Sequence, residues 1–88
     1  MLKKVTTKDS ISINYELVKK DGKKPTLVFI HGLGGNYTEF KEQAKSAQKR
    51  GYTTLALDLR GHGISSIPEE DEKYVLDLFV NDIRTVLQ

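Results

Sequence analysis

The stretch LVFIHGLGGNYTEF, residues 27–40, holds the residue types best suited to chemistry in this chain. An apolar run ends at His31, and the glycines Gly32, Gly34 and Gly35 follow it closely. Glycine lacks a Cβ, so a turn of this kind lets backbone N–H groups approach a ligand. Such groups can stabilise the negative charge that develops on a carbonyl oxygen under nucleophilic attack, at about 3–4 kcal/mol for one donor. An oxyanion hole is therefore one interpretation of the turn.

Two other interpretations of the glycine turn compete with it. A dinucleotide-binding fingerprint requires a third glycine where this chain has Tyr37, and a Walker A loop requires Gly-Lys-Ser/Thr where it has Gly35-Asn36-Tyr37. Both phosphate-binding templates fail at the residues that carry their mechanism. Glycines between a strand and a helix also serve tight packing alone. The turn by itself favours this structural interpretation and leaves the oxyanion hole open.

Four segments around the turn have the patterns of β-strands. Residues 10–17 place apolar side chains at every second position, as a strand with one buried face does. A first strand over residues 3–7 can form a hairpin with it. Residues 26–30 and 52–59 are continuous apolar runs, typical of strands that are buried on both faces of a parallel sheet.

Two helices complete the pattern. The first is expected to begin at Asn36, with Glu39 completing a capping box, and to end at Gly51. The second is expected over residues 74–88, where apolar residues recur at helical spacing. The order is then β-β-β-α-β-α in one α/β unit over residues 1–88. Alternating strands and helices predict a mostly parallel sheet flanked by helices, with right-handed crossovers.

The composition excludes several classes of protein. Hydrophobic residues make up 38% and charged residues 30% of the 88, and a formal charge of +2 is too small to imply nucleic acid. The chain has no cysteine, which excludes disulfides and thiolate metal sites. Its longest apolar run, Leu27–Ile30, is too short to span a bilayer, and Lys3-Lys4 is not followed by the apolar region of a secretory signal. We expect a cytoplasmic protein without a metal or a cofactor.

Two motifs in order suggest a family. LVFIHGLGGNYTEF is followed by LALDLRGHGISS, residues 55–66, and together they resemble the N-terminal portion of the α/β-hydrolase superfamily. The likeness is greatest to the esterase, lipase and peroxidase-like branch, and it covers residues 10–88. It implies an α/β fold that lacks strand five and everything after it.

The resemblance also implies roles for particular residues. Leu33 would donate its backbone N–H to an oxyanion, in a loop between the third strand and the first helix. The other residues that match the two motifs would shape the loops beside the site: His31, Gly32, Gly34, Gly35, Asp58, Arg60, Gly61, His62 and Gly63.

The nucleophile, the acid and the catalytic histidine of the family are absent from these 88 residues. No G-x-S-x-G elbow occurs, so Ser65 and Ser66 are not expected to act as nucleophiles. The family's catalytic histidine lies near the far end of its chain, so His31 and His62 are expected to be hydrogen-bonded loop residues. The chain alone is therefore expected to be inactive.

Two functions follow as hypotheses. The first is the front part of a hydrolase of carboxylic esters or related acyl substrates; the second is a non-catalytic half-fold that acts as a binding or assembly module. In the family's strand order, residues 26–30 would form a bare sheet edge, which predicts a second polypeptide bearing the catalytic half, or self-association. A trimmed or truncated product is the third possibility. The sequence leaves open whether the nucleophile is Ser, Asp or Cys, the substrate, and any cap domain.

Overall fold

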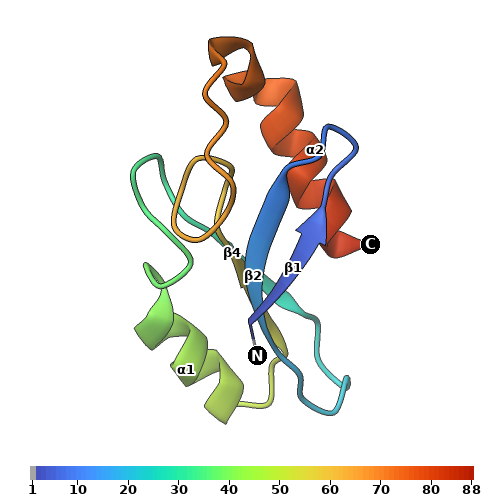
Figure 1. Ribbon diagram of the computed structural model, residues 1–88. Coiled ribbons are helices and arrows are strands. Elements are labelled where there is room, and N and C mark those ends of the chain that lie inside the picture. Colours follow the sequence, from blue (N-terminus) through green and yellow to red (C-terminus); the bar gives the residue numbers. More distant parts are fainter. Residues whose placement is uncertain (1) are drawn as a thin grey trace.

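Figure 1 presents the computed structural model, which describes residues 2–88. The elements are β1 (Leu2–Thr6), β2 (Ser12–Val18), β3 (Leu27–Ile30), α1 (Lys41–Lys49), β4 (Thr54–Leu57), the 3-10 turn η1 (Asp71–Tyr74) and α2 (Leu76–Leu87). Apart from η1, this is the predicted β-β-β-α-β-α order.

The four strands form one mixed sheet in the order β1-β2-β4-β3. β3 and β4 are parallel, with Val28 opposite Leu55, and α1 connects them. β1 pairs antiparallel with β2, and β2 pairs antiparallel with β4. The predicted parallel crossover is thus confirmed, but the sheet is mixed rather than mostly parallel. The reason is the N-terminal hairpin, which contributes both antiparallel pairings.

One hydrophobic core lies between the sheet and α2. Its buried members are Ile11, Ile13, Leu55, Leu57, Leu59 and Val86. Tyr15 and Leu17 pack against it, so the prediction that alternate residues of the second strand share one face is confirmed. Phe79 and Ile83 of α2 also pack there, whereas Leu76, in the first turn of the helix, is 76% exposed.

α1 lies on the opposite face of the sheet from α2 (Figure 1). Phe40, just before α1, packs against Phe29 of β3 with the ring centroids 5.6 Å apart. β4, in the centre of the sheet, is buried along its whole length, but β3 is only partly buried and Ile30 is 43% exposed. Burial on both faces was predicted for both strands and is wrong for β3, because β3 is an edge strand of this sheet.

The first helix starts later than its capping box predicts. α1 begins at Lys41, and the side chain of Asn36 accepts a hydrogen bond from the backbone N–H of Thr38 at 2.9 Å. The Glu39 carboxylate accepts from Gly32 N–H instead of reaching back to Asn36. Tyr37 N–H donates to the Asp58 carboxylate at 2.6 Å, which holds this segment against the loop after β4. Gly51, with φ +92°, ends the helix as expected.

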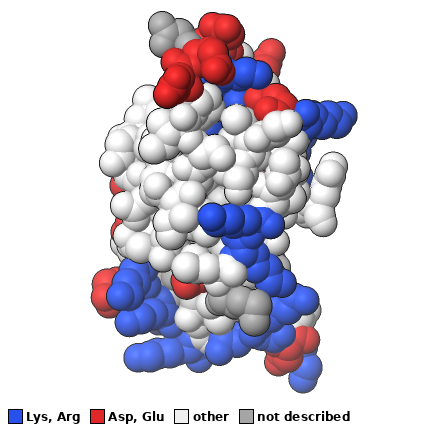
Figure 2. Space-filling model, viewed as in Figure 1, with Lys and Arg blue, Asp and Glu red and all other residues white. Residues whose placement is uncertain are grey.

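On the face that Figure 2 shows, Lys and Arg side chains dominate the lower end, and acidic side chains gather at the upper end together with some basic ones. Lys19, Lys20, Lys23 and Lys24 are exposed on the loop between β2 and β3, at the lower end in the view. Glu69, Glu70 and Glu72 are exposed around η1, at the opposite end. The helices of residues 2–88 include none that is long and apolar enough to cross a bilayer.

Candidate functional site

Two loops meet at the carboxyl ends of β3 and β4. Because these neighbouring strands are parallel, the turn at residues 31–35 and the loop at residues 58–63 leave the sheet at the same end of the strands. The rings of His31 and His62, one from each loop, lie with their centroids 4.9 Å apart. The structure therefore brings together the two motifs that the sequence singled out.

The two histidines hydrogen-bond across the junction between the loops. Leu59 N–H donates to His31 Nε2 at 3.0 Å, and Gly34 N–H donates to His62 Nε2 at 2.9 Å. The Nδ1 atoms face backbone oxygens, at 2.6 Å from Gly32 for His31 and 2.9 Å from Arg60 for His62. Every ring nitrogen is thereby occupied, so neither ring offers a free nitrogen for a general base.

The backbone amides of the glycine turn differ in their partners. Gly32 N–H donates to the Glu39 carboxylate at 3.3 Å, Gly34 N–H to His62, and Gly35 N–H to the Gly32 carbonyl at 3.0 Å. Within residues 2–88, Leu33 N–H has no hydrogen-bond partner. Leu33 is 84% exposed, so this amide belongs to a residue at the surface of the turn. The turn offers one open donor rather than a cradle of several.

Asp58 joins the loop after β4 to two other segments, β2 and the stretch before α1, and braces the loop itself. Its fully buried carboxylate accepts hydrogen bonds from the Asn14 side chain of β2 at 2.9 Å, from Tyr37 N–H at 2.6 Å and from Ile64 N–H at 2.9 Å. Ser65 Oγ donates to the Asp58 carbonyl at 2.7 Å and accepts from Asn14 N–H at 2.8 Å. The carboxylate is satisfied by neutral donors and is committed to holding the loops.

Close packing explains two of the loop glycines. Gly63 has φ +51°, and a Cβ there would overlap the Asp58 carboxylate. Gly35 keeps an ordinary φ, but a Cβ would lie 2.5 Å from Glu39 Oε1 and 3.2 Å from the Gly32 carbonyl oxygen. A side chain at either position would displace groups that shape the site.

Arg60 is fully buried, and its side chain bonds to segments other than the glycine turn. Its guanidinium donates two hydrogen bonds of 2.7 Å to Asp82 of α2, and it pairs with Asp9 at 2.9 Å. A further bond of 3.0 Å reaches the Lys73 carbonyl. The hydrogen bond from Arg60 lowers the pKa of the Asp9 carboxyl from 3.8 to about 2, and the bonds to Asp82 raise the pKa of Arg60. Arg60 thus fastens the hairpin loop, η1 and α2 to the loop after β4.

Sequence reasoning missed three buried polar residues that support the site. Asn14 and Asp82 lay within patterns interpreted only as strand and helix, and Ser65 was excluded as a nucleophile without being given a supporting role. All three are less than 5% exposed. A signal did exist for Asp82, since an aspartate beside Ile83 in an apolar helical stripe needs a cationic partner.

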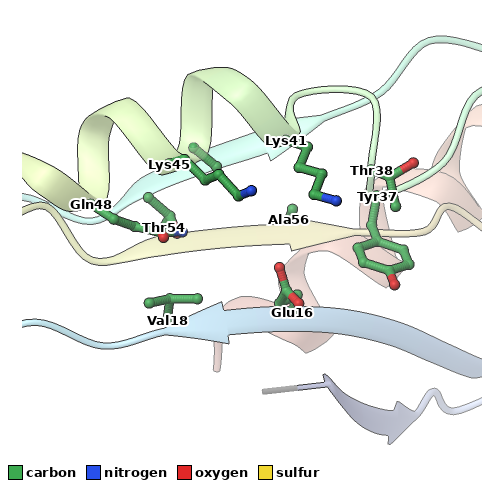
Figure 3. A pocket seen from close by; sticks show the side chains of 10 residues that line it. Glu16, Val18, Tyr37, Thr38, Lys41, Lys45, Gln48, Thr54 and Ala56 are labelled. Atoms are coloured by element: carbon green, nitrogen blue, oxygen red, sulfur yellow. The ribbon is translucent and has the colours of Figure 1, made fainter.

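A cavity of about 270 Å³ lies between α1 and the sheet, as Figure 3 shows. Glu16 and Val18 of β2, Lys41 of α1 and Ala56 of β4 are among its lining residues. Residues 31–35 and 58–63 do not line it, so it is separate from the junction of the two loops. Among the residues that the structure describes, no cluster of His, Asp and Glu side chains is arranged to hold a metal ion.

Residues 25–88 match the model of the alpha/beta hydrolase fold family, and the chain belongs to this family. Human Protein ABHD8 is 39% identical over 62 residues, which are 70% of this chain and 14% of that protein. Mouse Epoxide hydrolase 4 is 34% identical over 84 residues, which are 94% of this chain and 23% of that protein. The resemblance drawn from the two motifs is thereby confirmed.

The solved structures give the same result. The esterase EaEST from Exiguobacterium antarcticum superposes with a TM-score of 0.89 at 26% identity, and covers 100% of this chain. The match takes up 31% of that esterase. The 88 residues therefore correspond to a minor part of each of these proteins, from 14% to 31% of its length.

Proposed function

We propose that this chain is the front part of a hydrolase that acts on carboxylic esters or related acyl substrates. Leu33 would supply a backbone N–H to the oxyanion, and the remaining catalytic groups would come from a segment or polypeptide that completes the fold. The named relatives include an esterase and an epoxide hydrolase, so they support hydrolysis more strongly than the choice of ester. A cytoplasmic location stays a prediction.

The state of the Leu33 amide carries this proposal. Among the amides of residues 32–35 it is the one without a partner in the described part of the chain, while those at 32, 34 and 35 are all engaged. The turn is held at its start by His31, which accepts Leu59 N–H, and at Gly34 by His62, which accepts the Gly34 N–H. A donor fixed before the reaction stabilises developing charge without reorganising, which is the requirement for an oxyanion hole.

The test removes the backbone N–H of residue 33 by substitution, in a protein that carries the completing catalytic segment. Leu33→Pro removes the N–H, and we expect kcat for a chromogenic short-chain ester to fall about 10²–10³-fold. Leu33→Ala keeps the N–H and removes only an exposed side chain, so its kcat is expected to stay within about threefold of the wild type. Equal losses in the two variants would exclude a role for this amide. Turnover by the 88-residue chain alone would contradict the proposed division of the catalytic groups.

A non-catalytic binding or assembly module is the second candidate. The observation that favours it is the outer side of β3, which has no neighbouring strand within residues 2–88. Testing an epoxide substrate beside the ester would distinguish an epoxide hydrolase from an esterase if the completed protein is an enzyme. Failure of both substrates in the completed protein would favour the module.

A further inference from the structure

The two loops exchange the same kind of hydrogen bond in opposite directions. His31, from the turn after β3, accepts the N–H of Leu59 in the loop after β4 at 3.0 Å. His62, from the loop after β4, accepts the N–H of Gly34 in the turn after β3 at 2.9 Å. We call this pair of contacts the histidine clasp. It joins the loops independently of the Asp58 carboxylate, which binds Tyr37, Ile64 and Asn14 instead.

The partners determine the protonation state of both rings. A backbone N–H points at each Nε2, so that nitrogen must carry a lone pair. Each Nδ1 faces a carbonyl oxygen, of Gly32 or of Arg60, and must carry the proton. Both imidazoles are then neutral in the same Nδ1–H tautomer. A ring with two protons, or with the proton on Nε2, would set one N–H against another and open the clasp.

We propose that His62 is a positioning residue that selects which amide of the glycine turn faces the substrate. Gly34 is exposed and has φ +86°, so without His62 its N–H would be a second open donor beside that of Leu33. By accepting the Gly34 N–H, His62 leaves Leu33 as the single open donor and fixes the turn around it. His31, which is 4% exposed, fixes the base of the turn. This inference rests on the proposed function, since it explains why the Leu33 N–H rather than the Gly34 N–H would serve as the oxyanion donor.

The first experiment examines the clasp itself in the ¹⁵N-labelled 88-residue chain by NMR. Long-range ¹H–¹⁵N spectra are expected to show the Nδ1–H tautomer for both histidines. Couplings across the hydrogen bonds are expected between Gly34 N and His62 Nε2, and between Leu59 N and His31 Nε2. An Nε2–H tautomer for His62, or no coupling to Gly34, would overturn the proposal without any variant being made.

The second experiment compares two replacements of His62. His62→Gln keeps an acceptor at the end of a side chain of similar reach, whereas His62→Leu removes it. We expect hydrogen exchange at the Gly34 amide to accelerate about three- to tenfold in His62→Leu, which corresponds to the loss of one ordinary hydrogen bond. In His62→Gln the exchange rate is expected to stay near that of the wild type. Unchanged exchange in His62→Leu would overturn the selection of the donor.

The third experiment measures ester hydrolysis in the protein that carries the catalytic segment. His62→Leu is expected to lower kcat about ten- to a hundredfold with KM changed less than about threefold, and His62→Gln is expected to recover most of the loss. A normal kcat in His62→Leu, with Leu33→Pro impaired, would overturn the positioning role of His62 and leave the proposed function standing. An inactive wild type would overturn the proposed function and the positioning role with it, whereas the NMR couplings would still be observed.

Discussion

At the scale of single residues, the loops depend on atoms that a side chain would displace. A Cβ on Gly63 would overlap the Asp58 carboxylate. The φ of Gly63, +51°, also lies in the left-handed region. Asp58 in turn accepts Tyr37 N–H, so a shift of this carboxylate would be felt at the start of α1. One glycine thus supports both loops of the candidate site.

Gly63→Ala is expected to destabilise the chain by about 2–3 kcal/mol, since it adds left-handed strain to a clash with a buried carboxylate. The matched control is Gly22→Ala, because Gly22 has φ +79° but open space around its Cβ position. Strain alone should cost about 1 kcal/mol there. Denaturant unfolding measures both free energies. Equal losses would mean that contact between Gly63 and Asp58 has no energetic weight.

At the scale of elements, Arg60 is the main link among pieces that are distant in sequence. It reaches the hairpin loop through Asp9, α2 through Asp82 and η1 through the Lys73 carbonyl. A buried ion pair is costly to break from one side, since the remaining charge stays desolvated. The network therefore ties the position of α2 to the loop that also carries His62.

The free energy of unfolding is expected to depend on this network at acidic pH. The Asp9 pKa falls from 3.8 to about 2 on folding because Arg60 donates to its carboxylate. A lowered pKa contributes stability that is complete above the unfolded value and is lost as the pH falls through the folded value. Since part of Asp9 faces solvent, we expect the contribution to be about 1–2 kcal/mol at neutral pH and to vanish near pH 2.

Asp9→Asn measures this contribution by urea unfolding at a series of pH values. The variant should be less stable than the wild type at neutral pH, and the two curves should converge as the pH approaches 2. Asp21→Asn is the control, because Asp21 is exposed in the loop between β2 and β3. A difference between wild type and Asp9→Asn that stays constant down to pH 2 would show that the carboxylate charge is not the cause.

Hydrophobic patterning was enough to predict the elements but not their ends or their polar support. Alternation placed Ile13, Tyr15 and Leu17 on the core face, because one-sided burial leaves a period of two. The start of α1 was wrong because Asp58, far along the chain, takes the Tyr37 amide. The sequence pattern around residues 36–41 cannot indicate a contact with a residue so far along the chain. The two motifs indicated where a candidate site lies, yet only the structure shows that, among the amides of residues 32–35, that of Leu33 has no partner in the described part of the chain.

At the scale of the whole molecule, the unpaired side of β3 is an open edge of the sheet. β2 and β4 have a strand on both sides, whereas β1 and β3 are the two edge strands, and in the described chain β3 pairs only with β4. β1 carries Lys3 and Lys4, which guard its edge. The β3 segment Leu27–Ile30 is apolar, with no charge or proline among its residues. Edges of this kind invite another strand.

We therefore expect the 88-residue chain to self-associate through β3 when no completing segment is present. Ile30→Lys places a charge on the edge at a side chain that is already 43% exposed, and should lower the association measured by size-exclusion chromatography with light scattering. Leu87→Lys is the control, since it makes the same kind of change on α2, where Leu87 is 54% exposed. Equal dissociation of both variants would indicate that net charge acts rather than the edge. A stable wild-type monomer at micromolar concentration would contradict the exposed-edge argument, because the N–H and C=O groups on the outer side of β3 would then be satisfied by water alone.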